Sequence, residues 1–476
     1  MFNLARSLLL TSPLLTVFAT ALVVMLLDLF KPKSRFSTYF SYLGLIIGLI
    51  LSIRLFPGDQ DNVWINLFTL DNPGCILQIF ILVSVFFSIF YSSSKLASLD
   101  SAQGDILSLY LLSTVGMMLL VISDSMLSLY LSLELTSLPL YALVASQRNH
   151  QKSVEAAVKF FIMGAIASVF ILFGMSFIYG LTGQVSLLAA SKSLAVNVSQ
   201  NQLLIMFGLI LIIAGASFKM ALVPFHMWVP DVYVGANPVM TLFLSAAPKI
   251  AGLGIFLRLS MSGLFDVIPM VHHILGILAI ASIALGNFTA IMQSDLRRLL
   301  AYSTISHMGY AMLGLVAGGK EGQSASMLYM IIYSLMTIIA FASVILPQSN
   351  HKLLFSVDDL KGLNKRSPWL AAMLMIVFFS MAGVPPAIGF LAKFFVIRAL
   401  VDSGIYYIAI IALILAVIGA FYYLNLIRQM YFESTSNSQP VEVTSGKKFV
   451  FILQSLLLLG LGLFPNALIS LCVQAF

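Results

Sequence analysis

The chain has 476 residues, of which 60% are hydrophobic and only 9% are charged, with a formal net charge of +7. Soluble globular domains carry about 25% charged residues, so this composition excludes a water-soluble protein and indicates an integral membrane protein. The basic residues lie mainly between apolar runs, which favours a role in membrane orientation over nucleic-acid binding. Cys75 and Cys472 are far apart and have no metal-binding or redox spacing.

Apolar runs long enough to cross a bilayer as helices follow one another along the whole chain. The first lacks a strongly basic start and a cleavage site, so we expect a retained helix rather than a signal peptide. The twelfth is long and is interrupted at Gly383 to Pro386. The runs number fourteen and lie at about 8–29, 37–56, 73–93, 106–122, 124–146, 157–181, 202–223, 237–260, 268–292, 299–317, 325–346, 368–401, 404–431 and 449–473. The predicted fold is an all-α polytopic membrane protein.

Basic residues alternate between the two sides of this predicted topology. The odd-numbered loops hold fifteen: Lys31, Lys33, Arg35, Lys95, Arg148, Lys152, Arg297, Arg298, Lys352, Lys361, Lys365, Arg366, Arg428, Lys447 and Lys448. The opposite side holds six: Arg6, Arg54, Lys192, Arg258, Lys320 and Arg398. The positive-inside rule therefore places the odd loops in the cytoplasm and both termini on the other side.

Four basic residues are left inside the predicted spans, namely Lys159, Lys219, Lys249 and Lys393, and Glu134 is the one acidic residue deep in a span. A charge at the bilayer centre costs roughly 2.5 to 3.5 kcal/mol on insertion scales, so such residues usually mark ion or proton pathways. The alternative is that the side chain reaches the membrane surface. That alternative is strongest for Lys159, because Lys159 lies near the start of its span.

A weak internal repeat connects the two halves of the chain. Ser123-Asp124 recurs as Ser294-Asp295, 171 residues later, and Lys219 has a counterpart in Lys393, 174 residues later. The offset spans five helices, and an odd number of helices inverts the second copy in the membrane, as in many transporters. We expect helices 1–3 at about 8–93, a first repeat at about 106–260, a second at about 268–431 and a last helix at about 449–473.

Both repeated lysines lie near proline breaks, at Pro224 and at Pro385-Pro386. Proline frees backbone groups that are tolerated at membrane depth only inside protein or in contact with water. A carboxylate near a buried lysine favours the protonated amine, so a Glu134–Lys219 pair that separates would act as a proton switch. Water between the lysines would pass the proton along the membrane interior.

Two histidines are candidates for proton transfer near neutral pH. His226 lies in the first proline break, and His307 lies inside the tenth span; for both, a purely structural role is the alternative. No histidine cluster has metal-ligand spacing, and no phosphate loop, haem motif or iron–sulfur motif is present. We therefore expect no bound cofactor and no electron transfer on this chain.

Four segments carry a resemblance to a known family: VPFHMWVPDVYVGANPV, SAAPKIAG, AYSTISHMGY and GVPPAIGFLAKF. They closely resemble the antiporter-like membrane subunits of bacterial NADH-quinone oxidoreductase, respiratory complex I, and among these the subunit N family. The resemblance covers essentially the whole chain. It implies two inverted five-helix bundles, formed by helices four to eight and nine to thirteen.

The resemblance also implies roles for single residues. Proton handling would fall on Glu134, Lys159, Lys219, Lys249 and Lys393, and His307 would line the path between the two halves. Quinone chemistry would occur elsewhere in the complex, with FMN and iron–sulfur clusters on partner subunits. The partners would be other membrane and peripheral subunits of the complex, including other antiporter-like subunits, together with the quinone used by the complex and the lipid of a bacterial inner membrane. Both termini would be periplasmic.

Two other functions share parts of this pattern. A subunit of an Mrp-type sodium/proton antiporter would also have Glu134, Lys219 and broken helices. The amino-acid sequence around Pro224 nevertheless resembles complex I more closely and favours that assignment. A structural membrane scaffold would tolerate removal of the intramembrane charges without loss of pumping.

Overall fold

The computed structural model describes residues 4–30, 35–56, 61–96, 103–147, 149–347, 354–434 and 441–476. The chain forms two compact units. Unit 1 comprises Met1–Met220, Gly235–Ile274 and Ala475–Phe476, and unit 2 comprises Ala221–Val234 and Leu275–Gln474. Four basic residues of the predicted loops lie outside the described residues: Lys31, Lys33, Arg148 and Lys352.

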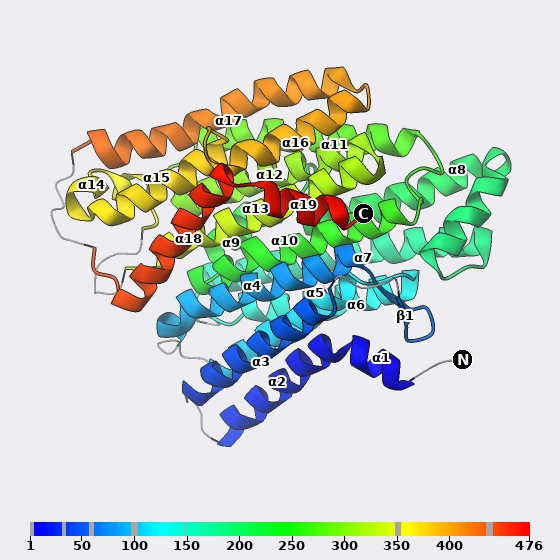
Figure 1. The fold of residues 1–476 in the computed structure, drawn as a ribbon, viewed down its shortest axis with the longest axis horizontal. Helices are drawn as coiled ribbons and strands as arrows, with labels where there is room; N and C mark the ends of the chain where they lie inside the picture. Colours follow the sequence, from blue (N-terminus) through cyan, green and yellow to red (C-terminus); the bar gives the residue numbers. More distant parts are fainter. Residues whose placement is uncertain are drawn as a thin grey trace. The chain divides into compact units, whose positions relative to one another are not determined.

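Unit 1 is built from packed helices and one short hairpin (Figure 1). Its elements are α1 (Leu4–Leu10), α2 (Ser12–Phe30), α3 (Arg35–Arg54), β1 (Asp61–Val63), β2 (Phe68–Leu70), α4 (Asn72–Leu96), α5 (Gln103–Leu120), α6 (Met126–Val144), α7 (Gln151–Thr182), α8 (Leu187–Met220), α10 (Pro238–Met261) and the start of α11 (Met270–Ile291). Helix α2 packs against α3 and α5, α7 packs against α8, and α10 packs against α4.

Unit 2 is helical throughout its described residues, apart from connecting turns (Figure 1). Its elements are most of α9 (Trp228–Gly235), the rest of α11, α12 (Leu296–Ala317), α13 (Gly319–Ile345), the 3-10 turn η1 (Val357–Leu360), α14 (Leu363–Arg366), α15 (Pro368–Ala382), α16 (Ile388–Asp402), α17 (Tyr406–Phe432), α18 (Ser445–Leu463) and α19 (Asn466–Gln474). Helix α13 packs against α12 and α16, and α15 packs against α17 and α18.

Three of the helices begin where a side chain caps their unpaired N–H groups. Ser125 accepts a hydrogen bond from the Ser128 N–H before α6, Asn237 accepts from Val239 N–H before α10, and Asp295 caps α12. The β1–β2 hairpin rests on the turn between α5 and α6, because Thr69 N–H donates to the Ile122 carbonyl at 2.8 Å. This hairpin is a small local exception to the predicted all-α fold.

The internal repeat has a matching backbone contact in each unit. In unit 1, Ser125 forms an isolated antiparallel bridge with Ser186, and in unit 2 Asp295 forms one with Ser356. Each residue of the second bridge follows its counterpart by 170 residues, close to the offset expected from the sequence. The two units thus have the same type of backbone bridge at the start of α6 and at the start of α12. The inversion of the second repeat in the membrane stays a prediction.

The predicted membrane fold is confirmed. Thirteen helices in the described part of the chain are long and apolar enough to cross a membrane. The predicted twelfth span is the pair α15 and α16, separated at residues 383–387. The predicted last span is also two helices, α18 and α19, because Pro465 has no N–H and disfavours a helical conformation at Phe464, where φ is −126°.

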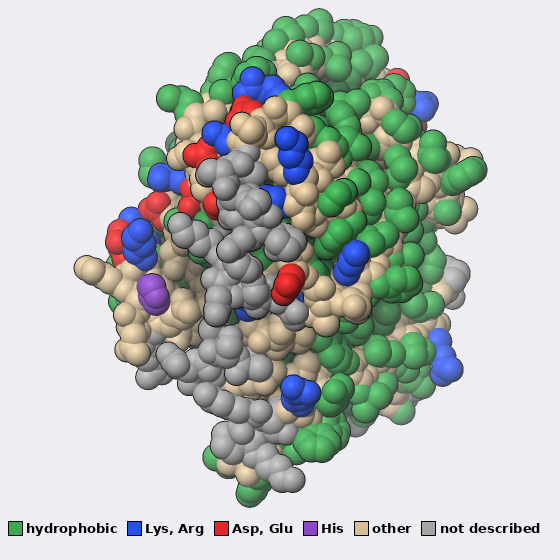
Figure 2. Space-filling view, turned by 90° about the vertical axis from the view of Figure 1, so that its left-hand side faces the viewer, with side chains coloured by type: hydrophobic (Ala, Val, Ile, Leu, Met, Phe, Trp, Pro, Cys, Tyr) green, Lys and Arg blue, Asp and Glu red, His purple; other side chains and the backbone are tan. Residues whose placement is uncertain are grey.

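The helices differ in how much of their surface faces other parts of the chain. In α10, α12 and α13, 94% of the residues in an apolar stretch of 18 residues are buried. In the corresponding stretches, 33% of the residues are buried in α2 and 39% in α7. Hydrophobic side chains therefore cover wide areas of the surface, with few charged ones among them on part of the face in Figure 2. Such a surface suits lipid or other membrane subunits.

Candidate functional site

Lys219 lies in the last turn of α8 and is held by two hydroxyl groups of α6. Its Nζ atom donates to Ser137 Oγ at 2.8 Å and to the Tyr141 hydroxyl at 3.2 Å. The same Nζ lies 5.6 Å from the centre of the Tyr141 ring, within range of a cation–π contact. Neutral oxygens and a ring face therefore stabilise this amine in unit 1.

Glu134 lies on the same face of α6 as Ser137 and Tyr141, because residues three and seven positions apart align on a helix. Its carboxylate accepts a hydrogen bond from Ser168 of α7. Among the described residues, no ion pair within 4.0 Å joins Glu134 to Lys219, although Ser137, a hydrogen-bond partner of Lys219, lies one helical turn further on. The acid and the base expected to form a pair are thus neighbours that bind different hydroxyl groups.

Lys249 comes from the middle of α10 and is 1% exposed. Its Nζ atom donates to the backbone carbonyl of Lys219 at 3.3 Å. In an unbroken helix that carbonyl would accept from Val223 N–H, but Val223 N–H donates to Ser282 Oγ instead. The end of α8 therefore leaves a carbonyl for Lys249, at the helix terminus that attracts positive charge.

Lys393 of α16 makes an equivalent contact at the end of α15. Its Nζ atom donates to the carbonyl of Ala382, the last residue of α15, at 2.8 Å. The residue four positions later is Pro386, which has no N–H to offer, so the proline break itself frees this carbonyl. Lys393 Nζ also lies 5.2 Å from the centre of the Tyr310 ring.

His307 of α12 is bonded on both sides of its ring inside unit 2. Nδ1 lies 2.7 Å from the Tyr329 hydroxyl, and Nε2 lies 3.0 Å from the Tyr423 hydroxyl. The Tyr423 hydroxyl is in turn hydrogen-bonded to Ser303 Oγ. His307 and these three partners are each at most 3% exposed.

The remaining two candidates have different surroundings. Lys159 of α7 has a side chain that is 44% exposed and pairs with Glu155 at 2.8 Å, so it lies on an outer face of unit 1. His226 is 8% exposed in the turn before α9, and its Nδ1 atom has no hydrogen-bond partner among the described residues. The structure thus groups Glu134, Lys219 and Lys249 in unit 1, and it places His307 and Lys393 in the interior of unit 2.

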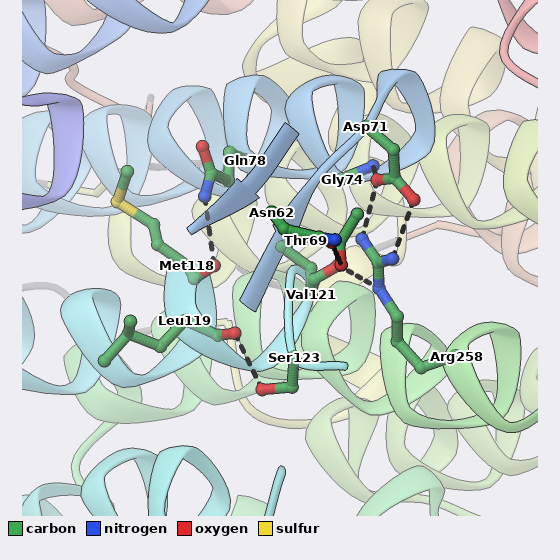
Figure 3. A network of polar contacts seen from close by, with 10 residues as sticks. All are labelled: Asn62, Thr69, Asp71, Gly74, Gln78, Met118, Leu119, Val121, Ser123 and Arg258. Atoms are coloured by element: carbon green, nitrogen blue, oxygen red, sulfur yellow. Dashed lines mark hydrogen bonds and ion pairs between the residues drawn. The ribbon is translucent and has the colours of Figure 1, made fainter. Parts of the chain in front are cut away.

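Sequence reasoning did not identify the hydroxyl partners or one buried ion pair. The spacing from Glu134 was a usable signal for Ser137 and Tyr141, but no signal pointed to Ser168. Arg258, predicted to lie at the membrane surface, instead forms a bidentate pair with Asp71, with both distances 2.7 Å (Figure 3). Its Nε also donates to the Val121 carbonyl at 2.6 Å.

Within the described residues, no group of three or more His, Cys, Asp or Glu side chains is placed to hold a metal ion. The chemistry that the arrangement can support is proton binding and release. Its titratable groups are amines, a carboxylate, an imidazole and phenols. Lys219, Glu134 and His307 are bonded to hydroxyl groups, which both donate and accept, whereas Lys249 and Lys393 are bonded to backbone carbonyls.

Comparisons with known proteins identify the family. Residues 123–419 match the family model described as NADH:quinone oxidoreductase/Mrp antiporter, TM. NADH-quinone oxidoreductase subunit N of Nitrosomonas europaea is 42% identical over 455 residues, which cover 95% of this chain and 94% of that protein. The subunit N of Coxiella burnetii is 40% identical over 470 residues, which cover 98% of each.

Solved structures agree with this assignment. A chain of respiratory complex I from Thermus thermophilus superposes with a TM-score of 0.82 at 27% identity, covering 96% of this chain and 98% of that chain. A chain of the Mrp complex from Dietzia sp. gives a TM-score of 0.83 at 20% identity, covering 99% and 97%, which shows a likeness of fold alone. With a family model that covers more than half of its length and near full-length relatives about 40% identical, the chain belongs to the subunit N family of NADH-quinone oxidoreductases.

Proposed function

We propose that this chain is the proton-translocating membrane subunit of an NADH-quinone oxidoreductase. Electron transfer from NADH to quinone in other subunits would drive protons through buried side chains here: Glu134, Lys219, Lys249, His307 and Lys393. Lys159, paired with Glu155 on an outer face, and His226 are further candidates for the path. FMN and iron–sulfur clusters belong to partner subunits, and the complex lies in a bacterial inner membrane with both termini of this chain periplasmic.

The observation that carries the proposal is the separated acid–base pair of unit 1. Lys219 binds Ser137 and Tyr141, while Glu134 binds Ser168, yet Glu134 and Ser137 are one turn apart on α6. A small movement of either side chain would exchange a hydroxyl partner for the opposite charge. A scaffold has no need for such an arrangement, because buried charges cost stability.

The pair acts as a switch through ordinary electrostatics. When Glu134 contacts Lys219, the carboxylate stabilises the ammonium form, and when they part, that stabilisation is lost. The proton then passes to the next acceptor, with water or Lys249 in reach of the end of α8. A conformational signal from the redox subunits therefore needs only to change the Glu134–Lys219 distance.

The test is pumping by assembled complexes that carry Glu134→Ala or Lys219→Ala. The complex is purified from native membranes through this chain, which should bring down flavin and iron–sulfur subunits. We expect both variants to assemble and to lose about a hundredfold of coupled NADH–quinone turnover and proton pumping, the low end for a lost proton-transfer group. Lys320→Ala, at an exposed position in the first turn of α13, is the matched control.

Two outcomes contradict the proposal. Normal pumping in both assembled variants would return the chain to the structural scaffold. Co-purification with antiporter subunits only, without flavin or iron–sulfur proteins, would favour the sodium/proton antiporter.

A further inference from the structure

A continuous chain of four proton-bearing groups crosses the interior of unit 2. It runs from the Tyr329 hydroxyl of α13 to Nδ1 of His307, and from Nε2 of His307 to the Tyr423 hydroxyl of α17. It ends at Ser303 Oγ, one turn before His307 on α12. Three helices thus contribute to one unbroken line of hydrogen bonds.

The line is shielded from solvent. Ser303 is 0% exposed, and Tyr329 and Tyr423 are each 1% exposed. Both ring nitrogens of His307 are engaged by tyrosine hydroxyls. A proton that enters or leaves this imidazole in the observed arrangement therefore passes through a phenol.

The chemistry of the line allows transfer in either direction. A neutral imidazole carries one N–H and one acceptor nitrogen, and each hydroxyl both donates and accepts. In one polarity Tyr329 donates to Nδ1, Nε2–H donates to Tyr423, and Tyr423 donates to Ser303. In the reverse polarity every bond runs the other way, and the imidazole has the opposite tautomer.

We propose that Tyr329 and Tyr423 are proton-relay residues that carry protons to and from His307. The inference rests on the proposed function and extends it to two residues. A proton arriving at the Tyr329 oxygen displaces the phenolic proton to Nδ1, the Nε2 proton moves to Tyr423, and the Tyr423 proton moves to Ser303, which releases its own. One proton enters, one leaves, and His307 changes tautomer without becoming charged.

A purely structural network is the competing explanation, because buried tyrosines and histidines need hydrogen-bond partners in any case. Tyr110 provides the matched control. It lies on α5 in unit 1, is 0% exposed, and donates its hydroxyl to the Val239 backbone carbonyl at 3.0 Å, outside the line. Tyr110→Phe therefore removes a buried phenolic hydroxyl without cutting the relay.

The experiment compares Tyr329→Phe, Tyr423→Phe and Tyr110→Phe in the purified whole complex. Proton pumping and NADH–quinone turnover are measured per assembled complex, in H₂O and in D₂O. We expect about a hundredfold loss of pumping in the first two variants, a changed solvent isotope effect, and near-normal values in Tyr110→Phe. If a tyrosine variant does not assemble, Ser303→Ala replaces it, because this variant removes only the last hydroxyl of the line. A loss of pumping would then support the relay, and normal pumping would overturn it.

The possible results distinguish a failure of the proposed relay from a failure of the proposed function. Normal pumping in Tyr329→Phe and Tyr423→Phe, together with loss in Lys219→Ala, overturns the relay and leaves the proposed function intact. Equal losses in all three tyrosine variants also overturn the relay, since they would reflect the cost of removing any buried hydroxyl. Normal pumping in both Glu134→Ala and Lys219→Ala overturns the proposed function itself.

Discussion

Lys219, Lys249 and Lys393 each donate hydrogen bonds to neutral oxygen atoms. Lys219 binds two hydroxyls, whereas Lys249 and Lys393 bind backbone carbonyls at the ends of α8 and α15. An ammonium group bonded to a neutral oxygen lacks the charge–charge attraction that a carboxylate partner would add. A lysine held by neutral oxygens keeps its place in the interior yet remains free to exchange its partner or its proton. Proton transfer requires that combination.

Gly383 is the residue that makes room for Lys393. It has φ of 82°, and a Cβ at this position would lie 2.9 Å from Lys393 Cδ. Gly404 has φ of 76°, but a Cβ there would meet nothing within 4 Å. Gly383→Ala and Gly404→Ala therefore share a backbone cost of roughly 1–2 kcal/mol, while only Gly383→Ala displaces the Lys393 side chain.

We expect Gly383→Ala to lower proton pumping per assembled complex several-fold, because Lys393 loses its position at the Ala382 carbonyl. Gly404→Ala should pump normally with a slightly lower thermal midpoint. Pumping assays on both complexes at equal subunit content provide the measurement. Equal pumping in the two variants would show that the position of Lys393 does not matter.

At the scale of elements, the approach of α7 to α6 sets the surroundings of Lys219. A Cβ at Gly164 of α7 would meet the Tyr141 hydroxyl, which is one of the two partners of Lys219. Gly180 lies on the same helix, with nothing within 4 Å of its Cβ position. Both glycines have helical backbones, so alanine is acceptable at both for the helix itself.

Gly164→Ala should push Tyr141 away from Lys219 and cost about 1–3 kcal/mol, the usual range for overpacking. Gly180→Ala should be neutral or slightly stabilising. Thermal unfolding of the purified complex measures the stability cost of each substitution. Coupled turnover shows whether moving Tyr141 away from Lys219 impairs function. A Gly164→Ala complex with unchanged turnover would mean that Tyr141 is not needed to position Lys219.

The elements themselves were largely predictable, because long apolar runs and proline breaks are local signals. The interruption at Gly383 to Pro386 and the start of the seventh span near Asn201, where φ is −126°, follow from the sequence. The split of the last helix at Pro465 was missed because the residues on both sides are equally apolar. The pairing of Asp71 with Arg258, 187 residues apart, was beyond reach because one sequence does not show which distant segments meet.

At the scale of the whole chain, the Asp71–Arg258 pair joins segments that are distant in sequence. Asp71 precedes α4 and accepts Gly74 N–H at 2.9 Å, while Arg258 reaches from the last turn of α10 to Asp71 and to the Val121 carbonyl (Figure 3). The two side chains are 3% and 7% exposed. The pair therefore fixes the end of the helix that carries Lys249 against the start of α4 and the end of α5.

Removing one partner of such a pair leaves an uncompensated buried charge, at a cost of about 3–5 kcal/mol. We expect Arg258→Met alone to reduce the amount of folded subunit in membranes and the thermal stability of the complex. The double variant Asp71→Asn/Arg258→Met should be clearly more stable than Arg258→Met. Asparagine still caps α4, and neither charge remains.

Thermal unfolding of the Asp71→Asn, Arg258→Met and double-variant complexes, with the unmodified complex as reference, gives the interaction energy of the pair. A double variant as unstable as Arg258→Met would mean that the loss comes from packing of the arginine and its bond to Val121, not from the charge left on Asp71. If the double variant is stable yet pumps poorly, the charge pair serves proton transfer by holding α10, and with it Lys249, in register with the end of α8.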